Sequence, residues 1–253
     1  MAAPDPQEET SSSFERHHGP ADLKGKVVVV VGGSRGIGFA VAASVARAGA
    51  TVAIIARDAA RLRQAGKALG AALTLRADAT QEMQTERAFR VLGGHFRRLD
   101  ALVNSAGTFT YKPFENTTAK DWDLNLKANL TSVFLATRAA LPLLVKSQGQ
   151  VVNILSVSSR HGFANCSAYT AAKFGALGLT RVLAEELRPK GVRVSAILPG
   201  ATNTRLVKAF GFPIEPERLV QPEDVAEAVF TVLLAPRHAT IAEIVVTPSG
   251  GSI

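Results

Sequence analysis

Cysteine is almost absent from this sequence. The 253 residues contain one, Cys166, which excludes an internal disulfide framework and fits a reducing compartment. We therefore expect a cytoplasmic protein. The five histidines and the cysteine show none of the spacings of zinc ligands, so no metal site is expected.

Long hydrophobic runs are missing as well. Hydrophobic residues make up 47% of the chain, yet no stretch resembles the run of about eighteen or more apolar residues that crosses a membrane. The composition therefore predicts a buried core and no membrane partner.

Acidic residues are in deficit, with 21 Asp and Glu against 29 Lys and Arg. Such a surplus of positive charge favours a phosphate-bearing partner, either nucleic acid or a phosphorylated cofactor, or it forms only a solvated basic surface. The sequence contains no homeodomain, zinc-finger or RNA-recognition signature. We therefore expect no nucleic-acid partner.

Residues 1–25 differ in composition from the rest of the chain. They are rich in Pro, Ser, Glu and His and show no periodic apolar pattern, which predicts a flexible tail. They lack the apolar region of a secretory signal, and they contain Glu8, Glu9 and Glu15, which a mitochondrial presequence would avoid. Residues 26–253 are the expected folded domain.

From residue 26 onward, short apolar runs alternate with amphipathic stretches. The expected strands are 27–31, 51–56, 73–77, 99–104, 150–155, 192–198 and 241–246. The expected helices are 36–48, 58–69, 80–92, about 119–147, about 166–188 and 222–235. Seven fully apolar strands separated by helices predict an α/β fold, a doubly wound parallel sheet with helices on both faces, in one domain. Ligands of such sheets bind at the carboxyl ends of the strands.

A glycine-rich turn joins the first expected strand to the first expected helix. A turn without Cβ atoms lets backbone N–H groups and the helix N-terminus meet a pyrophosphate. Glycines between a strand and a helix often form only a turn, but their place after the first strand of an α/β chain favours a dinucleotide site. The residues concerned are Gly32, Gly33, Ser34, Arg35, Gly36, Ile37 and Gly38.

With this turn the chain begins to resemble the short-chain dehydrogenase/reductase family, and the resemblance runs from about residue 26 to residue 251. It implies a Rossmann-type domain that binds a nicotinamide cofactor and reduces a carbonyl group. The family usually has Thr before the first glycine of the turn, where this chain has Val31. That difference removes a side-chain hydrogen bond but leaves the phosphate contacts possible.

The end of the second expected strand indicates which cofactor binds. An NAD site needs a carboxylate there for the ribose 2′-hydroxyl, but the sequence has Ala56 followed by Arg57. Asp58 comes two positions late and is better explained as the cap of the next helix. In the family, a basic residue before the second glycine of the motif marks NADPH preference, and Arg35 stands there. Two guanidiniums suit a 2′-phosphate, so NADP(H) is expected.

The resemblance assigns further cofactor contacts after later strands. Asp78 matches a residue that meets the adenine, although a helix cap before Thr80 explains it equally well. Asn104 opens a segment that resembles the family's Asn-Asn-Ala-Gly, and it serves sheet structure more than chemistry. The expected contacts beyond the turn and Arg57 are Asp78, Asn104, Ala106, Gly107, Tyr169, Lys173, Pro199, Gly200, Thr202 and Thr204.

Tyr169 and Lys173 lie one helical turn apart and share a helix face. Ser156 precedes Tyr169 by thirteen residues, the separation that the family shows between its catalytic serine and tyrosine. The resemblance implies that Tyr169 donates a proton and that Ser156 holds the substrate oxygen. Asn129 matches the family residue that positions a water for Lys173, although a helix asparagine can equally serve a neighbouring backbone group.

Carbonyl reduction explains why a tyrosine and a lysine occur together. The oxygen must gain a proton as hydride reaches the carbon, and a free tyrosine has a pKa of about 10, too high for ready exchange at neutral pH. We therefore expect the ammonium of Lys173 to lower the pKa of Tyr169 and to bind the nicotinamide ribose.

Other chemistries find little support. No base stands at a recognisable spacing from Cys166, so a buried small residue explains it better than a nucleophile does. Ser156 lies between Leu155 and Val157, which excludes the Gly-x-Ser-x-Gly turn of a hydrolase.

Aromatic residues after the fourth, fifth and sixth strands indicate a moderately apolar carbonyl substrate, although such residues can equally pack against the sheet. The candidate pocket residues are Phe109, Tyr111, His161, Phe163, Phe210 and Phe212.

Three functions stay open at this point. The chain is an NADPH-dependent reductase of free ketones or aldehydes, a reductase of β-ketoacyl thioesters on a carrier protein or coenzyme A, or an NADPH sensor without turnover. The complete set of Ser156, Asn129, Tyr169 and Lys173 argues against the sensor. Family members usually pair through the two long helices, here about 119–147 and 166–188, so a homodimer or homotetramer is expected.

Overall fold

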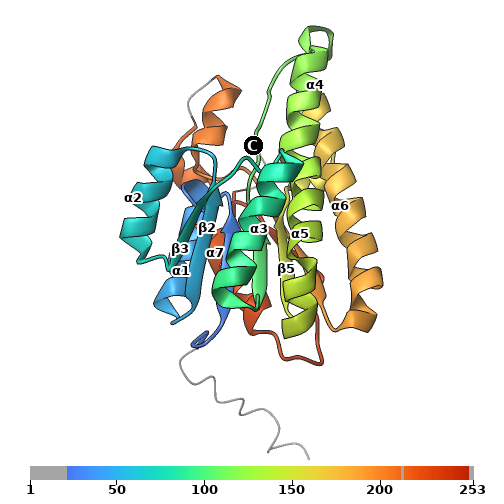
Figure 1. The fold of residues 1–253 in the computed structure, drawn as a ribbon. Helices are drawn as coiled ribbons and strands as arrows, with labels where there is room; N and C mark the ends of the chain where they lie inside the picture. Colours follow the sequence, from blue (N-terminus) through green and yellow to red (C-terminus); the bar gives the residue numbers. More distant parts are fainter. Residues whose placement is uncertain (1–21, 212–213, 251–253) are drawn as a thin grey trace, which may run out of the picture.

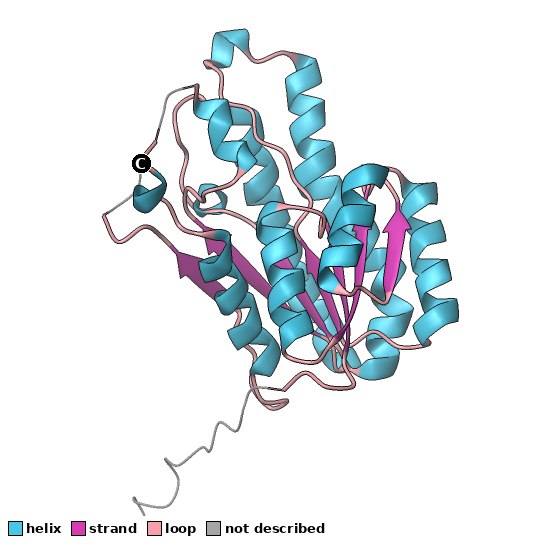
Figure 2. Ribbon diagram, turned by 90° about the vertical axis from the view of Figure 1, so that its left-hand side faces the viewer, coloured by secondary structure: helices cyan, strands magenta, loops and turns pink. Residues whose placement is uncertain are grey.

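The computed structural model describes residues 22–211 and 214–250. A seven-stranded sheet, parallel throughout, lies between two layers of helices in the order β3-β2-β1-β4-β5-β6-β7 (Figures 1 and 2). The strands are β1 Val27–Val31, β2 Thr51–Ala56, β3 Leu73–Arg76, β4 Ala101–Asn104, β5 Gln150–Ile154, β6 Arg193–Pro199 and β7 Glu243–Val246. The main helices are α1 Gly36–Arg47, α2 Ala59–Leu69, α3 Glu82–Phe96, α4 Ala119–Leu126, α5 Ser132–Ser147, α6 Ser167–Leu187 and α7 Pro222–Leu234. The predicted fold class is confirmed.

Alternate residues of the central strands enter two separate cores. Val28 and Val30 pack with residues of α1, α2 and α7, whereas Val27, Val29 and Val31 pack with residues of α3, α5 and α6. Because β-strand side chains alternate between faces, a strand buried on both sides must be apolar throughout. The continuous valine run of β1 meets that requirement.

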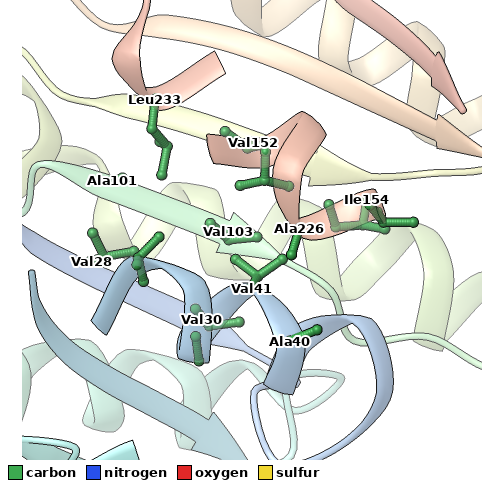
Figure 3. Packing of buried hydrophobic residues seen from close by; sticks show 14 of the residues in the cluster. Val28, Val30, Ala40, Val41, Ala101, Val103, Val152, Ile154, Ala226 and Leu233 are labelled. Carbon is green, nitrogen blue, oxygen red and sulfur yellow. The ribbon is translucent and has the colours of Figure 1, made fainter. Parts of the chain in front are cut away.

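Small residues let α1 and α7 approach the sheet closely. Figure 3 shows Val41 of α1 and Ala226 of α7 beside Val30 and Val103 of the sheet, and all four are almost completely buried. This packing fixes the position of α1, whose N-terminus begins at the glycine turn.

The expectation of seven fully apolar strands is wrong at the two edges of the sheet. In β3, Thr74 and Arg76 are exposed and alternate with half-buried leucines, and β7 begins with the half-buried Glu243. An edge strand lacks a neighbour on one side and is only partly covered by helices, so it tolerates polar side chains.

The expected single helix over 119–147 is divided by a wide turn. The π-helical segment η2, Lys127–Thr131, separates α4 from α5 and contains Asn129. The stretch from 119 to 147 is also long and apolar enough to span a membrane by length and composition, contrary to expectation. Core helices pass the same test, and here Ala136, Ala140 and Leu144 pack into the core between the sheet, α3 and α6.

The described part of the folded domain begins slightly before residue 26. Leu23 is buried in the core, and its backbone N–H donates to the carbonyl of Ala48. The expected tail therefore ends before Leu23, and its residues 1–21 lie outside the described part of the chain.

Candidate active site

A cleft of about 730 Å³ opens at the carboxyl ends of the strands. Segments that follow β1 to β6 all contribute to its lining. The strand order reverses between β1 and β4, and that switch point is where open α/β sheets bind ligands. The cleft contains every residue predicted for the cofactor except Gly33, Gly38 and Asn104.

The glycine turn is packed too tightly for side chains. A Cβ atom on Gly32 would lie 2.6 Å from the backbone nitrogen of Ala106, and one on Gly38 would lie 2.4 Å from the carbonyl oxygen of Gly32. Gly38 packs against the backbone of Gly32 in the turn and does not line the cleft. Helix α1 begins at Gly36 with no side-chain cap and no acidic residue in its first turn. Its N-terminal N–H groups fit the pyrophosphate of a dinucleotide.

Four arginines line one end of the cleft. Partial burial lowers the pKa of Arg35, and the positive charges of Arg61, Arg205 and Arg57 lower it further, in that order. Arg61 forms a salt bridge with Asp58, 3.4 Å between Nε and Oδ2. Within the described residues, no salt bridge joins a carboxylate to Arg35, Arg57 or Arg205. Positive charge gathered in this way fits a phosphate group.

The carboxylate of Asp58 is committed to α2. It accepts hydrogen bonds from the backbone N–H groups of Ala60 and Arg61, each at 3.1 Å, as expected of a helix cap. Ala56, at the end of β2, offers no carboxylate to a ribose hydroxyl.

Sequence reasoning missed two of the four arginines. Arg61 lies in the first turn of α2, close enough in sequence to Arg57 to be found by inspection. Arg205 follows β6, and nothing in its sequence neighbourhood connects it with Arg35. Thr204 lies close to the turn, because its Cγ2 atom is 3.5 Å from where a Cβ atom of Gly36 would stand. This close approach brings Arg205 to the arginine end of the cleft.

Asn104 lies outside the cleft. Its side-chain amide donates to Thr137 Oγ1 at 3.1 Å and to Asn153 Oδ1 at 2.8 Å. These buried bonds join β4 to β5 and α5, so the side chain cannot also face a cofactor. Asp78 does line the cleft, and its carboxylate accepts from the N–H and hydroxyl of Thr80.

Asn129 holds the loop that follows β4. Its amide nitrogen donates to the carbonyls of Thr108 and Asn125, both at 3.0 Å, and its oxygen accepts from the N–H of Thr108 at 3.2 Å. A Cβ atom on Gly107 would lie 2.7 Å from that oxygen. The side chain is fully used in fixing Gly107 and Thr108 at the cleft wall.

Ser156, Tyr169 and Lys173 come together in the cleft, from the end of β5 and the first turns of α6. The side chain of Ser156 acts on the phenol of Tyr169 and lowers its pKa. The ammonium of Lys173 donates to the carbonyl of Ile154 at 3.0 Å and lies 5.7 Å from the centroid of the Tyr169 ring. Two hydroxyl groups and a buried lysine can together bind and protonate an oxygen atom.

The pKa values of this centre differ from the sequence expectation. Burial raises the pKa of Tyr169 to about 12, and the side chain of Ser156 offsets only part of that rise. Burial also lowers the pKa of Lys173 to about 7. Desolvation, which penalises whichever form carries charge, outweighs the attraction expected between the ammonium and the phenolate.

Residues after β6 complete the wall. The hydroxyl of Thr202 donates to the carbonyl of Gly200 at 2.9 Å, and the hydroxyl of Thr204 accepts from the N–H of Leu206 at 3.3 Å. Pro199, Gly200, Thr202 and Thr204 all line the cleft, as expected from the sequence.

Aromatic residues line the other end of the cleft. Phe109, Tyr111, Phe163 and Phe210 are all present there. His161 was expected with them but is exposed and lies outside the lining, because the loop after β5 turns it toward solvent. Phe212 lies outside the described residues. Cys166 lines the cleft, and burial raises the pKa of its thiol, which disfavours a thiolate nucleophile.

Known proteins resemble the chain over most of its length. The family described as short chain dehydrogenase matches residues 26–211, a range that includes the glycine turn and the catalytic candidates. An uncharacterised oxidoreductase of Bacillus subtilis is 35% identical over 218 residues, which cover 84% of this chain and 84% of that protein. An uncharacterised oxidoreductase of Staphylococcus epidermidis is 30% identical over 230 residues, which cover 90% of this chain and 99% of that one.

Solved structures of oxidoreductases also resemble the chain over most of its length. An alcohol dehydrogenase from Thermococcus sibiricus, complexed with 5-hydroxy-NADP, superposes with a TM-score of 0.82 at 26% identity and covers 90% of this chain and 98% of its own. A metagenomic short-chain oxidoreductase in complex with NADP has a TM-score of 0.78 at 31% identity, with 90% and 98% covered.

The buried Lys173 predicts a pH-dependent stability. The unfolded chain keeps this lysine charged up to a pKa of about 10.5, but the folded protein does so only up to about 7. Between these values the unfolded state binds more protons, so the free energy of unfolding rises with pH, approaching about 1.4 kcal/mol per pH unit. In Lys173→Met this contribution disappears. Tyr169, whose raised pKa acts in the opposite direction, contributes only above about pH 10.

Urea unfolding of the parent and Lys173→Met between about pH 7 and 9.5 measures the difference in slope. Lys190→Met, at an exposed position, serves as the control and follows the parent. Parallel profiles for the parent and Lys173→Met would show that Lys173 keeps an ordinary pKa in the folded protein.

Proposed function

We propose a reaction for this chain from one premise: it belongs to the short-chain dehydrogenase/reductase family. It is an oxidoreductase, and we propose that it reduces the carbonyl group of a ketone or aldehyde with NADPH, in the cytoplasm. One observation carries the proposal. Ser156 and Tyr169 meet over the buried Lys173 in a cleft whose far end is lined by four arginines.

The tightly packed glycine turn and the uncapped N-terminus of α1 would hold the cofactor diphosphate, and the arginines would hold its 2′-phosphate. When bound, NADPH supplies the hydride that the carbonyl carbon accepts. The hydroxyl groups of Ser156 and Tyr169 bind the carbonyl oxygen. Because burial raises its pKa, Tyr169 is fully protonated at neutral pH, and its proton is in place when negative charge develops on that oxygen.

Lys173 restores the proton that Tyr169 gives up. Its pKa of about 7 means that it is partly protonated at neutral pH, and it lies against the Tyr169 ring. Asn129 acts indirectly, since its amide fixes the loop at Gly107 and Thr108, which lines the cleft. We therefore propose a positioning role for Asn129 in addition to any contact with water.

The substitution Tyr169→Phe tests the proposed reaction. It removes the transferable proton and leaves the arginines and the glycine turn in place. We expect a fall in kcat of about 10²–10⁴-fold with an unchanged Kd for NADPH, because general acid catalysis has that magnitude. Steady-state kinetics with a panel of ketones and fluorescence titration with NADPH measure the two quantities.

Tyr111→Phe is a matched control, because Tyr111 is the other tyrosine of the chain and also lines the cleft. It keeps most of the wild-type kcat. A Tyr169→Phe variant that retains more than a tenth of the wild-type kcat would rule out Tyr169 as the proton donor.

The arginine end of the cleft supports NADPH over NADH. Arg35 and Arg57 were expected there, and Arg61 and Arg205 add to the same positive region. Charge-assisted hydrogen bonds contribute about 1.5–3 kcal/mol each, so two of them favour NADPH by on the order of a hundredfold or more. Ala56 leaves the ribose 2′-hydroxyl of NADH without a carboxylate partner.

Two substitutions test this cofactor preference. Arg57→Ala raises the KM for NADPH and leaves the KM for NADH nearly unchanged, because NADH has no 2′-phosphate. Ala56→Asp lowers the preference for NADPH in two ways. The new carboxylate repels the 2′-phosphate of NADPH, and it accepts a hydrogen bond from the ribose 2′-hydroxyl of NADH. The measurement is kcat/KM for both cofactors, with Arg63→Ala, exposed on the same helix as Arg61 and outside the cleft, as control. Equal effects of Arg57→Ala on both cofactors would exclude a contact between Arg57 and the phosphate.

The outer faces of the long helices support a homodimer. Trp122 of α4, Phe134 of α5, and Phe174 and Val182 of α6 are exposed apolar side chains, and α4 packs against α6. Phe174 and Val182 are eight residues apart and therefore share one stripe of α6. Apolar side chains gathered in this way mark an interaction surface, and we propose that a second copy of the chain covers it.

Phe174→Glu tests this surface, because a buried, unpaired carboxylate opposes association. We expect the variant to shift toward the monomer mass in light scattering coupled to size exclusion. Met83→Glu, on an exposed position of α3, is the control and leaves the mass unchanged. A Phe174→Glu protein of wild-type mass would place the contact elsewhere.

A further inference from the structure

The reaction end of the cleft is lined by a continuous series of aromatic rings. Phe109 meets the ring of Tyr169 edge-on, with centroids 4.8 Å apart and an interplanar angle of 84°. Phe210 lies 5.2 Å from Phe109 and 5.1 Å from Tyr111, and Phe109 lies 6.3 Å from Tyr111. These distances are those of interacting aromatic pairs. The rings therefore extend the wall of the cleft outward from the proton donor.

These rings come from segments far apart in sequence. Phe109 and Tyr111 belong to the loop after β4, and Phe210 ends the short helix η5, Arg205–Phe210, after β6. The loop after β4 is fixed by the hydrogen bonds of Asn129. Phe210 therefore joins the segment after β6 to the loop after β4 at the reaction end.

The lining rings are not part of the buried core. Phe109, Tyr111, Phe163 and Phe210 are each only partly buried, and all four line the cleft. Rings that served the core alone would be covered, as Phe89 is between α3 and the sheet. Apolar surface that lines a cleft without being covered is what an apolar ligand group would bury.

Charge is separated along the cleft. The four lining arginines gather at the end where Arg35 lies, and Arg205 acts on Arg35 from there. At the reaction end, Lys173 is the only cation among the lining residues that the structure describes, and its ammonium is bound to the carbonyl of Ile154. Among the described lining residues near the rings, therefore, only the buried Lys173 is positively charged, and a carboxylate or phosphate on the substrate would find no other cation there.

From this arrangement we propose that the substrate is a carbonyl compound with an uncharged aromatic ring close to the carbonyl group. This rests on the proposed function, because Ser156 and Tyr169 must hold the carbonyl oxygen. With the oxygen held there, the substituents of the carbonyl carbon extend along Phe109 and toward Phe210 and Tyr111. A planar ring gains edge-to-face contacts with these side chains that a saturated ring of similar size does not make.

A pair of ketones isolates the contribution of the ring. Benzylacetone and its analogue with cyclohexane in place of benzene carry the same unconjugated methyl ketone, so the reactivity of the carbonyl is matched. We expect kcat/KM with NADPH to be higher for benzylacetone by about fivefold or more, the range of one or two aromatic contacts. Benzylacetone with a para-carboxylate should be a poorer substrate than benzylacetone itself, because no described cation of the ring wall meets it.

Phe210→Leu tests whether the wall causes this selectivity. The substitution leaves in place Phe109, whose ring meets that of Tyr169. We expect the ratio of the two kcat/KM values to fall below about twofold, because the substitution lowers the value for benzylacetone more than the value for the cyclohexyl analogue. Phe114→Leu, at an exposed phenylalanine outside the cleft, is the control and keeps the wild-type ratio.

Several results would overturn the proposal: equal kcat/KM for the two rings in the wild type, an unchanged ratio in Phe210→Leu, or a preference for the carboxylate or for an acetoacetyl thioester. Calorimetric titration of the Tyr169→Phe protein loaded with NADPH measures binding of both ketones without turnover. If benzylacetone binds this variant more tightly than the cyclohexyl analogue does, the result supports the aromatic site even if the wild-type protein reduces no carbonyl compound. The titration therefore tests the substrate class separately from the proposed reaction. Equal binding of both ketones overturns the proposed substrate class.

Discussion

The contact between the turn after β1 and the loop after β4 is the constraint on which the site depends. The backbone of Ala106 leaves no room for a side chain on Gly32, and the carbonyl of Gly32 leaves none on Gly38. This close approach fixes the start of α1 at the point where the strand order reverses. The N-terminal N–H groups of α1 therefore point into the cleft, and the remaining wall is built around them.

The same constraint explains why the cleft has two chemically different ends. The turn after β1 places Arg35 beside the end of β2, which brings Arg57 and Arg61, and Thr204 brings Arg205 to the same place. The loop after β4 leads in the other direction, toward Phe109 and Tyr169. The contact between the turn after β1 and the loop after β4 therefore separates two ends of the cleft. One end carries the arginines, and the other carries the aromatic rings and Tyr169.

Buried amides keep the two walls in place. Asn104 joins β4 to β5 and α5, and Asn129 joins the π-helical turn to the loop after β4. Buried polar groups of this kind are stabilising when their hydrogen bonds are satisfied. Asn129 meets that condition through both its nitrogen and its oxygen. The nitrogen of Asn104 donates two hydrogen bonds, whereas its buried oxygen has no partner among the described residues. Both side chains are occupied by hydrogen bonds within the protein, which explains why an asparagine near an active site need not contact a ligand.

The sequence by itself determined the local features. The continuous valines of β1, the glycines that follow it, the cap at Asp58 and the spacing of Tyr169 and Lys173 depend on near neighbours in the chain, and the structure has them where they were expected. The alternation of such local patterns along the chain also predicted the parallel sheet, which the structure has.

Tertiary structure decided everything that depends on distant segments. It turned His161 to solvent, committed Asn104 to the sheet, brought Arg205 to Arg35 and left the edge strands half-covered. It also set the pKa values of Tyr169 and Lys173, for which the sequence predicted attraction and the structure shows the effect of burial. Burial and solvation are properties of the whole fold. The spacing of two residues on a helix fixes their distance from each other, but not how much water surrounds them.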